Sequence, residues 1–169
     1  LELGRAAAWV AIGAGLPVAL VAATAFAKIA VVLSILRGGL GVPGVLPALV
    51  TTALAAALTA LVMAPVARAV EAALPEDPLA DPGGSMEAGW PPVRAFLDRN
   101  TREADRAAVA GVAQALAGGA ERPAVAEGPE VRVAAFLISE LSAAFRMGVL
   151  LLLPFLVIDL LCANTLAVV

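Results

Sequence analysis

The sequence of 169 residues is poor in the side chains that catalyse reactions and hold metals. It has no histidine, which excludes Ser–His and Cys–His catalysis and haem held by histidine. Its one cysteine, Cys162, can form no intramolecular disulfide, and without histidine it cannot complete a zinc site of side chains. We therefore expect no metal and no cofactor. Because Cys162 lies in an apolar run, we expect it to be a small packing residue.

Charge is also scarce. Charged residues make up 15% of the sequence and hydrophobic residues 62%, and the mean hydropathy is +0.96. The net charge is −3 without a basic block, so nucleic acid is not an expected partner. Eleven acidic and five basic residues, 16 of the 25 charges, lie between Glu71 and Glu130. This distribution predicts two apolar segments, residues 1–70 and 131–169, on either side of a polar insert, residues 71–130.

The first apolar segment is predicted to begin with a long helix. Ala6–Ala27 contains no charge over 22 positions, enough to span a membrane, and the apolar pattern continues to Arg37. We expect this helix to bend near Gly15 or Pro17. The turn-forming residues of Gly38–Gly44 are predicted to end it.

A second apolar helix is predicted over Leu46–Val66, closed by Pro65 and Arg68. Its many alanine and threonine residues favour close packing, because small side chains let two helix backbones approach. The first two helices are therefore predicted to form a hairpin.

The insert and the last segment are predicted to be helical as well. The insert opens with a loop over Pro75–Gly84 and continues with short amphipathic helices, for which Asn100 and Thr101 are candidate caps. The last 39 residues are too long for one straight membrane span, and Pro154 lies among them, so we expect a kinked helix or a re-entrant hairpin. The predicted fold class is all-α, with membrane-type helical hairpins.

The two apolar segments hold the other nine charges, and five of these lie in apolar surroundings: Lys28, Arg37, Glu140, Arg146 and Asp159. On one helix, Lys28 and Arg37 would point about 180° apart and Glu140 and Arg146 about 240° apart. None has the i,i+4 spacing of a local ion pair. The cations either extend to a membrane edge, or these groups find partners across the fold or across an oligomer.

Three ordered blocks resemble one protein family. FAKIAVVLSILRGGLG (Phe26–Gly41), PVRAFLDRNTREADRA (Pro92–Ala107) and FLISELSAAFRMGVLLLLPFLVIDLL (Phe136–Leu161) are similar to signatures of the flagellar FliP and injectisome SctR proteins. Together the blocks and the insert between them cover nearly the whole chain. The resemblance implies a core subunit of a type III protein export apparatus.

This resemblance implies several further properties. About five copies would assemble with smaller membrane subunits into an export gate for unfolded secreted proteins. The chain would belong to the bacterial inner membrane, multi-pass by hydropathy, with the insert on the periplasmic side. The positive-inside rule agrees with this topology, because Lys28 and Arg37 flank the first turn and favour its cytoplasmic side. The charges in apolar helices would then be contacts between protein neighbours.

The resemblance implies no catalytic, metal or cofactor residue. It offers the residues at the family's signature positions as candidates for subunit contacts and assembly: Phe26, Lys28, Arg37, Arg94, Thr101, Arg102, Glu103, Asp105, Phe136, Glu140, Phe145, Arg146, Pro154, Phe155 and Asp159.

The sequence departs from the family pattern at the first hairpin turn and at its end. Gly38 replaces the usual asparagine, and Leu46–Ala48 replaces a Pro-Pro-Asn turn. The family pattern continues beyond the position of Val169 with a methionine-rich loop and a last apolar segment. We therefore expect this chain to be shortened relative to the family, without the loop that closes the gate.

Two other functions are compatible with parts of the sequence. A small-molecule transporter with an intramembrane charge relay would also carry buried charges, but the two apolar segments show no inverted repeat. An intramembrane enzyme could use Ser139 beside Glu140, but no histidine or lysine lies nearby, and Ser139 is predicted to be a helix-packing residue. The stretch RNTREAD (Arg99–Asp105) is interpreted as a solvated helix face, not a phosphate site.

Overall fold

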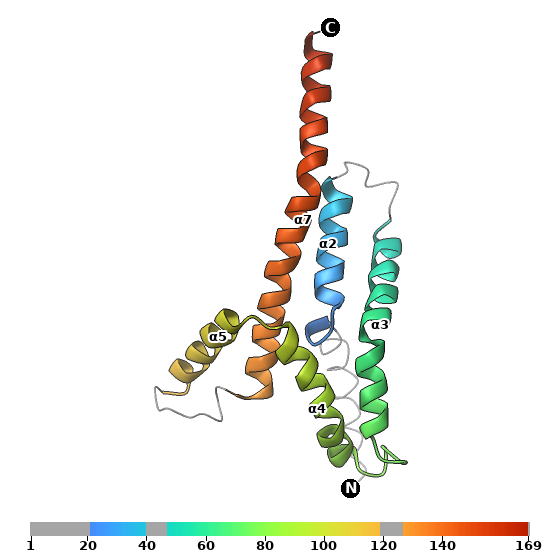
Figure 1. Cartoon of the computed structure of the whole chain (residues 1–169), viewed down its shortest axis with the longest axis vertical. Helices are drawn as coiled ribbons and strands as arrows, with labels where there is room; N and C mark the ends of the chain where they lie inside the picture. The colour runs from blue at the N-terminus through green and yellow to red at the C-terminus, as the bar shows by residue number, and fades with distance from the viewer. Residues whose placement is uncertain (1–20, 40–46, 119–126, 169) are drawn as a thin grey trace, which may run out of the picture.

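The computed structural model describes residues 21–39, 47–118 and 127–168. These residues form five α-helices and no strand, which confirms the predicted all-α class (Figure 1). The helices are α2 (Phe26–Gly39), α3 (Ala48–Ala73), α4 (Pro82–Asn100), α5 (Glu103–Leu116) and α7 (Pro129–Val168).

Helices α2 and α7 run parallel and in contact along the length of α2, with α3 on the other side of α2 (Figure 1). Small residues bring α2 and α7 together. A Cβ atom added at Gly148 would lie 3.1 Å from the Cβ atom of Ile35 and would collide with the end of that side chain. A Cβ atom at Gly39 would collide with Leu152. The two backbones therefore approach more closely than larger side chains allow.

The predicted long first helix is interrupted before α2, because residues 21 and 22 are helical and a new helix begins at Phe26. The chain turns at residues 23–25, and the hydroxyl oxygen of Thr24 accepts a hydrogen bond of 3.3 Å from the backbone N–H of Phe26. This oxygen satisfies one of the N–H groups that a new helix leaves open, so a local cap overrides the continuous apolar pattern. The bend expected at Gly15 or Pro17 lies outside the described residues.

Helix α3 continues past Pro65 to Ala73, so its predicted end at Val66 is wrong. Proline removes one backbone hydrogen bond, but alanine-rich turns surround it and have the highest helix propensity. Packing also extends the helix, because Val66 is buried in the core and Val70 packs against it. The helix ends where the backbone N–H of Leu74 bonds back to its last turn.

The loop before α4 is shorter than predicted. Helix α4 begins at Pro82, inside the stretch Pro75–Gly84 that the sequence assigns to a loop, because Asp81 accepts a hydrogen bond of 3.0 Å from the backbone N–H of Gly84. Proline suits the first position of a helix. At the other end, Asn100 and Thr101, the candidate caps, donate to carbonyl groups of α4, and Thr101 is its C-cap, so they close α4.

The last segment is one helix of 40 residues with Pro154 inside it, so the re-entrant hairpin offered as an alternative is wrong. At 1.5 Å per residue α7 is about 60 Å long, and its C-terminal part projects beyond the other described helices (Figure 1). Cys162 is exposed on this part, contrary to its predicted place in a packed core.

The fully buried core is small. Phe136 and Leu97 are its largest enclosed side chains, and the rings of Phe96 and Phe136 lie 5.5 Å apart and tilted by 58°. Together with Val66 they join α3, α4 and α7. Outside this core, α3 and α7 expose leucine and valine side chains along most of their length.

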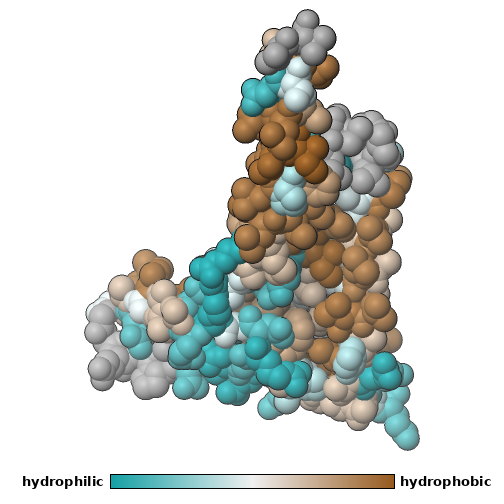
Figure 2. All heavy atoms as spheres, turned by 45° about the horizontal axis from the view of Figure 1, so that its top comes forward, coloured by the Kyte–Doolittle hydropathy of each residue, from teal (hydrophilic) through white to brown (hydrophobic). Residues whose placement is uncertain are grey.

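Polar and apolar surfaces lie at opposite ends of the molecule. Figure 2 shows apolar surface over α3 and the upper part of α7, and polar surface gathered below them over α4 and α5. By length and composition, α3 and α7 are each able to cross a membrane. The described structure thus joins two apolar helices to a polar foot.

The contact of α2 with α7 gives a first prediction. Gly148→Ala should lower the free energy of unfolding by about 1–3 kcal/mol, because overpacking forces Ile35 aside. Gly111→Ala is the matched control, since nothing lies within 4 Å of a Cβ atom there, and it should stabilise α5 by up to about 1 kcal/mol. Denaturant unfolding in detergent, followed by circular dichroism, measures both. Equal effects would contradict the close contact.

Candidate functional site

A buried ion pair joins α2 to α7. The Nζ atom of Lys28 lies 2.8 Å from Oε1 of Glu140, and Glu140 is 4% exposed. Sequence reasoning left open whether these charges meet across the fold or across an oligomer, and in the structure they meet across the fold. Glu140 does not pair with Arg146, which is exposed, as their helical angle predicts. A buried carboxylate with a single cation fixes the position of α2 along α7.

One carboxylate gathers three arginines at the junction of α4, α5 and α7. Asp98 accepts hydrogen bonds from Arg132 at 2.6 Å and from Arg106 at 3.2 Å, and Arg94 lies 3.6 Å away. Arg132 is 9% exposed and also donates to the backbone carbonyl of Glu127. Because each arginine comes from a different helix, this cluster holds the three helices together.

A second hydrogen-bonded node ties the start of α5 to α7. The hydroxyl of Ser139, 2% exposed, donates to Asp105 at 2.6 Å and accepts the backbone N–H of Arg102 at 3.0 Å. Asp105 also accepts a bond of 2.9 Å from the Arg102 side chain. Neighbouring residues of α7 thus face different helices: Ser139 bonds to α5 and Glu140 to α2.

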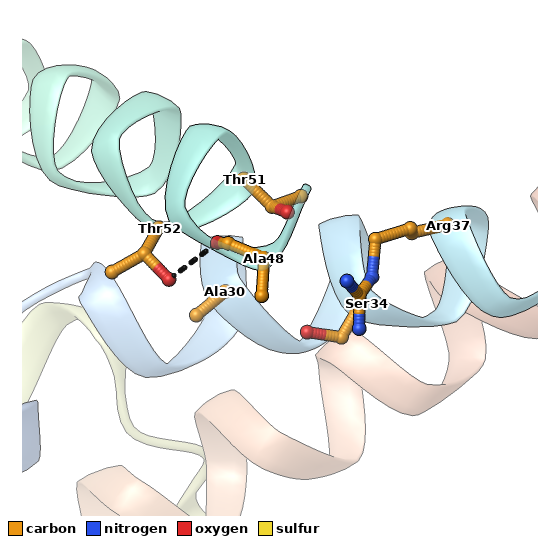
Figure 3. A pocket seen from close by; sticks show the side chains of 6 residues that line it. All are labelled: Ala30, Ser34, Arg37, Ala48, Thr51 and Thr52. Atoms are coloured by element: carbon orange, nitrogen blue, oxygen red, sulfur yellow. Dashed lines mark hydrogen bonds between the residues drawn. The ribbon is translucent and has the colours of Figure 1, made fainter. Parts of the chain in front are cut away.

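A small polar hollow lies between the end of α2 and the start of α3. Its volume is about 70 Å³, and it is lined by Arg37, three hydroxyl residues and two alanines. Figure 3 shows the guanidinium group of Arg37 folded back toward Ser34, with Thr51 and Thr52 across the hollow on α3. Both threonine hydroxyls donate to backbone carbonyls of Pro47 and Ala48. Arg37 is half-buried and forms no ion pair with any described residue.

Comparison with known sequences decides the family. A sequence model of the FliP family matches residues 10–169. The chain belongs to the FliP family. This confirms the family expected from the three signature blocks.

Curated relatives come from flagella and from virulence systems. The chain is 41% identical to the flagellar biosynthetic protein FliP of Pectobacterium carotovorum subsp. carotovorum, a match that covers 89% of this chain and 58% of the relative. It is 36% identical to the hypersensitivity response secretion protein HrcR of Ralstonia nicotianae and 35% identical to the virulence protein YscR of Salmonella typhimurium. Each of these matches covers 89% of this chain and 73% of the relative.

The structure divides the FliP-signature residues into internal and exposed groups. Lys28, Glu140, Arg94, Arg102 and Asp105 make the ion pairs and hydrogen bonds described above; Thr101 closes α4, Phe136 fills the core, and Phe26 and Arg37 line hollows. Arg94 and Arg102 are exposed although they form these bonds; exposed and without a bond described above are Glu103, Phe145, Arg146, Pro154, Phe155 and Asp159. Their role in contacts between subunits stays a prediction.

Sequence reasoning missed Asp98, Arg106, Arg132 and the bonding role of Ser139. Asp98 follows Arg94 at the i,i+4 spacing of a helical ion pair, so this one pair of the cluster was detectable from the sequence. The bond from Arg132 to Asp98 joins residues 34 positions apart. No local spacing signals such a contact.

The buried pair gives a second prediction. Lys28→Met should lower the free energy of unfolding by about 3 kcal/mol, because it leaves the Glu140 carboxylate buried without its cation. The reciprocal swap Lys28→Glu with Glu140→Lys should restore most of the loss, measured by denaturant unfolding. In the control swap, Glu140→Arg with Arg146→Glu, the second change should not restore the stability that Glu140→Arg alone loses. Rescue by the control swap would show that Glu140 and Arg146 pair directly.

The Ser139 node gives a third prediction. Ser139→Ala should cost about 1–3 kcal/mol, because Asp105 and the Arg102 N–H each lose a buried partner. Ser142→Ala, one turn along α7, should change stability by less than about 0.5 kcal/mol. Amide hydrogen exchange should be faster in α5 of the first variant only. Unchanged exchange there would mean that the node does not hold α5.

Proposed function

We propose that this chain is a structural subunit of a type III protein export apparatus, in which it lines the passage of unfolded proteins across the bacterial inner membrane. The observation that supports this most is the FliP-family match over residues 10–169. Relatives named for flagellar biosynthesis, secretion and virulence support the same export function. None of these names supports the alternative of a small-molecule transporter.

The proposal includes a structural rather than an enzymatic role. The conspicuous polar groups of the described residues bond to one another between helices, as expected of a scaffold. The exposed apolar faces of α3 and α7 need to be covered by lipid or protein, since such large apolar patches mark interaction or membrane surfaces. We propose that about five copies cover part of this surface by packing against each other and against smaller membrane subunits.

The proposed topology follows the distribution of charge. Residues 1–70 and 131–169 would form the apolar parts, and residues 71–130 would be a periplasmic insert. Two features support this division: α4 and α5 carry most of the polar surface (Figure 2), and the long apolar helices flank them in the sequence.

Assembly tests the proposed function directly. The full-length protein, expressed with the membrane proteins encoded beside it, should purify in mild detergent as a complex of several copies, because single copies leave the apolar faces of α3 and α7 uncovered. Native mass spectrometry gives the copy number. Deletion of the gene should abolish export of flagellar or virulence proteins, and the intact gene should restore it. A chain that stays monomeric with its partners present would contradict the proposal.

Topology gives a separate prediction. In a Cys162→Ser background, Met86→Cys should react with a membrane-impermeant maleimide added to the periplasm, since Met86 is 73% exposed on α4. The neighbouring Ser85 is buried and would be a poor reporter. A cysteine at Met86 that reacts only from the cytoplasm would reverse the topology.

A further inference from the structure

Two opposite charges lie on the apolar helices without a described partner. Arg37 is half-buried in the polar hollow at the end of α2. Asp159 is exposed on the projecting part of α7, between Ile158 and Leu160, which are also exposed. Neither forms an ion pair with any residue that the structure describes. An ionised group in apolar surroundings is costly unless a counter-charge satisfies it.

The two charges cannot meet within one chain. Because α2 and α7 run parallel and Gly39 lies against Leu152, positions along the two helices can be compared. Asp159 is seven residues beyond Leu152, and Arg37 is two residues before Gly39, so they are separated by about 13 Å along the helix axis. The side chain of Arg37 leaves its helix toward the N-terminal end, away from Asp159. The two charges therefore do not neutralise each other within one copy, and no other described residue pairs with either of them.

A second copy of this chain offers each charge what it lacks. We propose that the Asp159 carboxylate of one copy occupies the Arg37 hollow of the next copy, an inference that rests on the proposed assembly of several copies. A carboxylate there would meet the guanidinium group, the most favourable partner for such an anion. It would also meet the hydroxyl of Ser34 on the same wall of the hollow (Figure 3).

The contact joins two different surfaces, so it is heterologous. Each copy would give its Asp159 to one neighbour and receive the Asp159 of another at its Arg37. Such a contact continues from copy to copy and produces a ring or a helical assembly rather than a closed pair. The apolar residues that flank Asp159 would be covered by the neighbouring α3 surface, where Leu49, Val50 and Leu54 are exposed on the helix whose first turns line the hollow.

Arg37 suits this contact better than Arg146, another cation of the apolar helices for which the described residues offer no ion pair. Arg146 is exposed on α7, where a long side chain can extend to water or lipid headgroups. It also lies 13 residues before Asp159 on the same helix, so a neighbour's Arg146 would need an offset of about 20 Å. Arg37 needs a smaller offset and already lies in a hollow lined by hydroxyl groups.

Disulfide cross-linking tests the contact in the full-length protein in its membrane. Ser34→Cys should form a disulfide with the native Cys162 of the next copy, since Cys162 lies one turn beyond Asp159 and Ser34 lies in the hollow. The pair cannot close within one chain. Ile35 lies against Gly148, so Cys162 is about 21 Å farther along α7, beyond the reach of about 7 Å between Cα atoms in a disulfide.

The expected product is a ladder of covalent dimers, trimers and larger species after mild oxidation. Three controls should give no ladder: the native chain, Ser34→Cys combined with Cys162→Ser, and Ala69→Cys, which places a cysteine on an exposed position at the opposite end of α3. A chain that forms its normal large complex but gives no ladder overturns the contact and leaves the proposed function standing. A native chain that forms no complex at all overturns both.

Charge reversal gives a second, independent measurement. Arg37→Asp or Asp159→Arg alone should weaken assembly about a hundredfold, since each leaves a desolvated charge without its partner. The reciprocal double variant should regain most of the assembly, whereas Arg146→Asp combined with Asp159→Arg should regain none. Rescue by the Arg146 combination would show that Asp159 pairs with Arg146 and not with Arg37, and would overturn the contact. Unchanged assembly in both single variants would mean that lipid or another subunit satisfies the two charges, and would also overturn the contact.

Discussion

The ion pair between Lys28 and Glu140 is the constraint on which the arrangement of the helices depends. Dispersion between apolar side chains has little directional preference, so two apolar helices can slide past each other at small cost. A buried carboxylate 2.8 Å from a single ammonium group cannot slide without losing its partner. Gly148 and Gly39 then let the helices approach at the position that the pair selects. The ion pair determines the position of α2 along α7, and the glycine residues allow the two helices to pack closely.

The polar foot depends on the same short stretch of α7. Ser139 forms hydrogen bonds with the start of α5, and the adjacent Glu140 forms an ion pair with α2. Helix α7 therefore connects the insert to the apolar helices through two neighbouring residues. Arg132, two turns earlier, adds the bond to Asp98 on α4. These contacts lie on one end of the molecule and are satisfied within the chain. A movement of α5 or α4 would therefore be transmitted to α7 and, through Glu140, to α2.

The sequence predicted the helices better than it predicted where they begin and end. Apolar runs and charge density were sufficient for the all-α class, because helix formation in an apolar segment needs only local hydrogen bonds. The positions of the helix ends depended on which interaction was stronger there, a side-chain cap or the packing of apolar residues. The cap of Thr24 interrupted an apolar run, whereas the packing of Val66 and Val70 carried α3 past Pro65. A single proline was thus weaker evidence for a helix end than its chemistry suggests.

The sequence likewise predicted some contacts of the candidate site and missed others. Helical angles showed correctly that Glu140 and Arg146 do not pair, because that argument uses only the geometry of one helix. They could not show that Lys28 is the partner, because 112 positions separate the two residues in the sequence. The same limit hid Asp98, Arg106 and Arg132, whose cluster exists only once three helices have packed. Contacts within one helix were predictable from spacing, and contacts between helices were not.

The two ends of the molecule differ in how fully their charges are satisfied, and this difference has a physical consequence. At the polar foot and at the adjoining contact of α2 with α7, each buried cation or carboxylate described above has a partner in the same chain, so its charge is satisfied without a second copy. At the other end, Arg37 and Asp159 have none among the described residues, and Asp159 lies beside the exposed Leu160. Such a surface is stable only when something covers it. The internal charges therefore select the shape of one subunit, whereas the unpaired charges restrict which surfaces can pack against it.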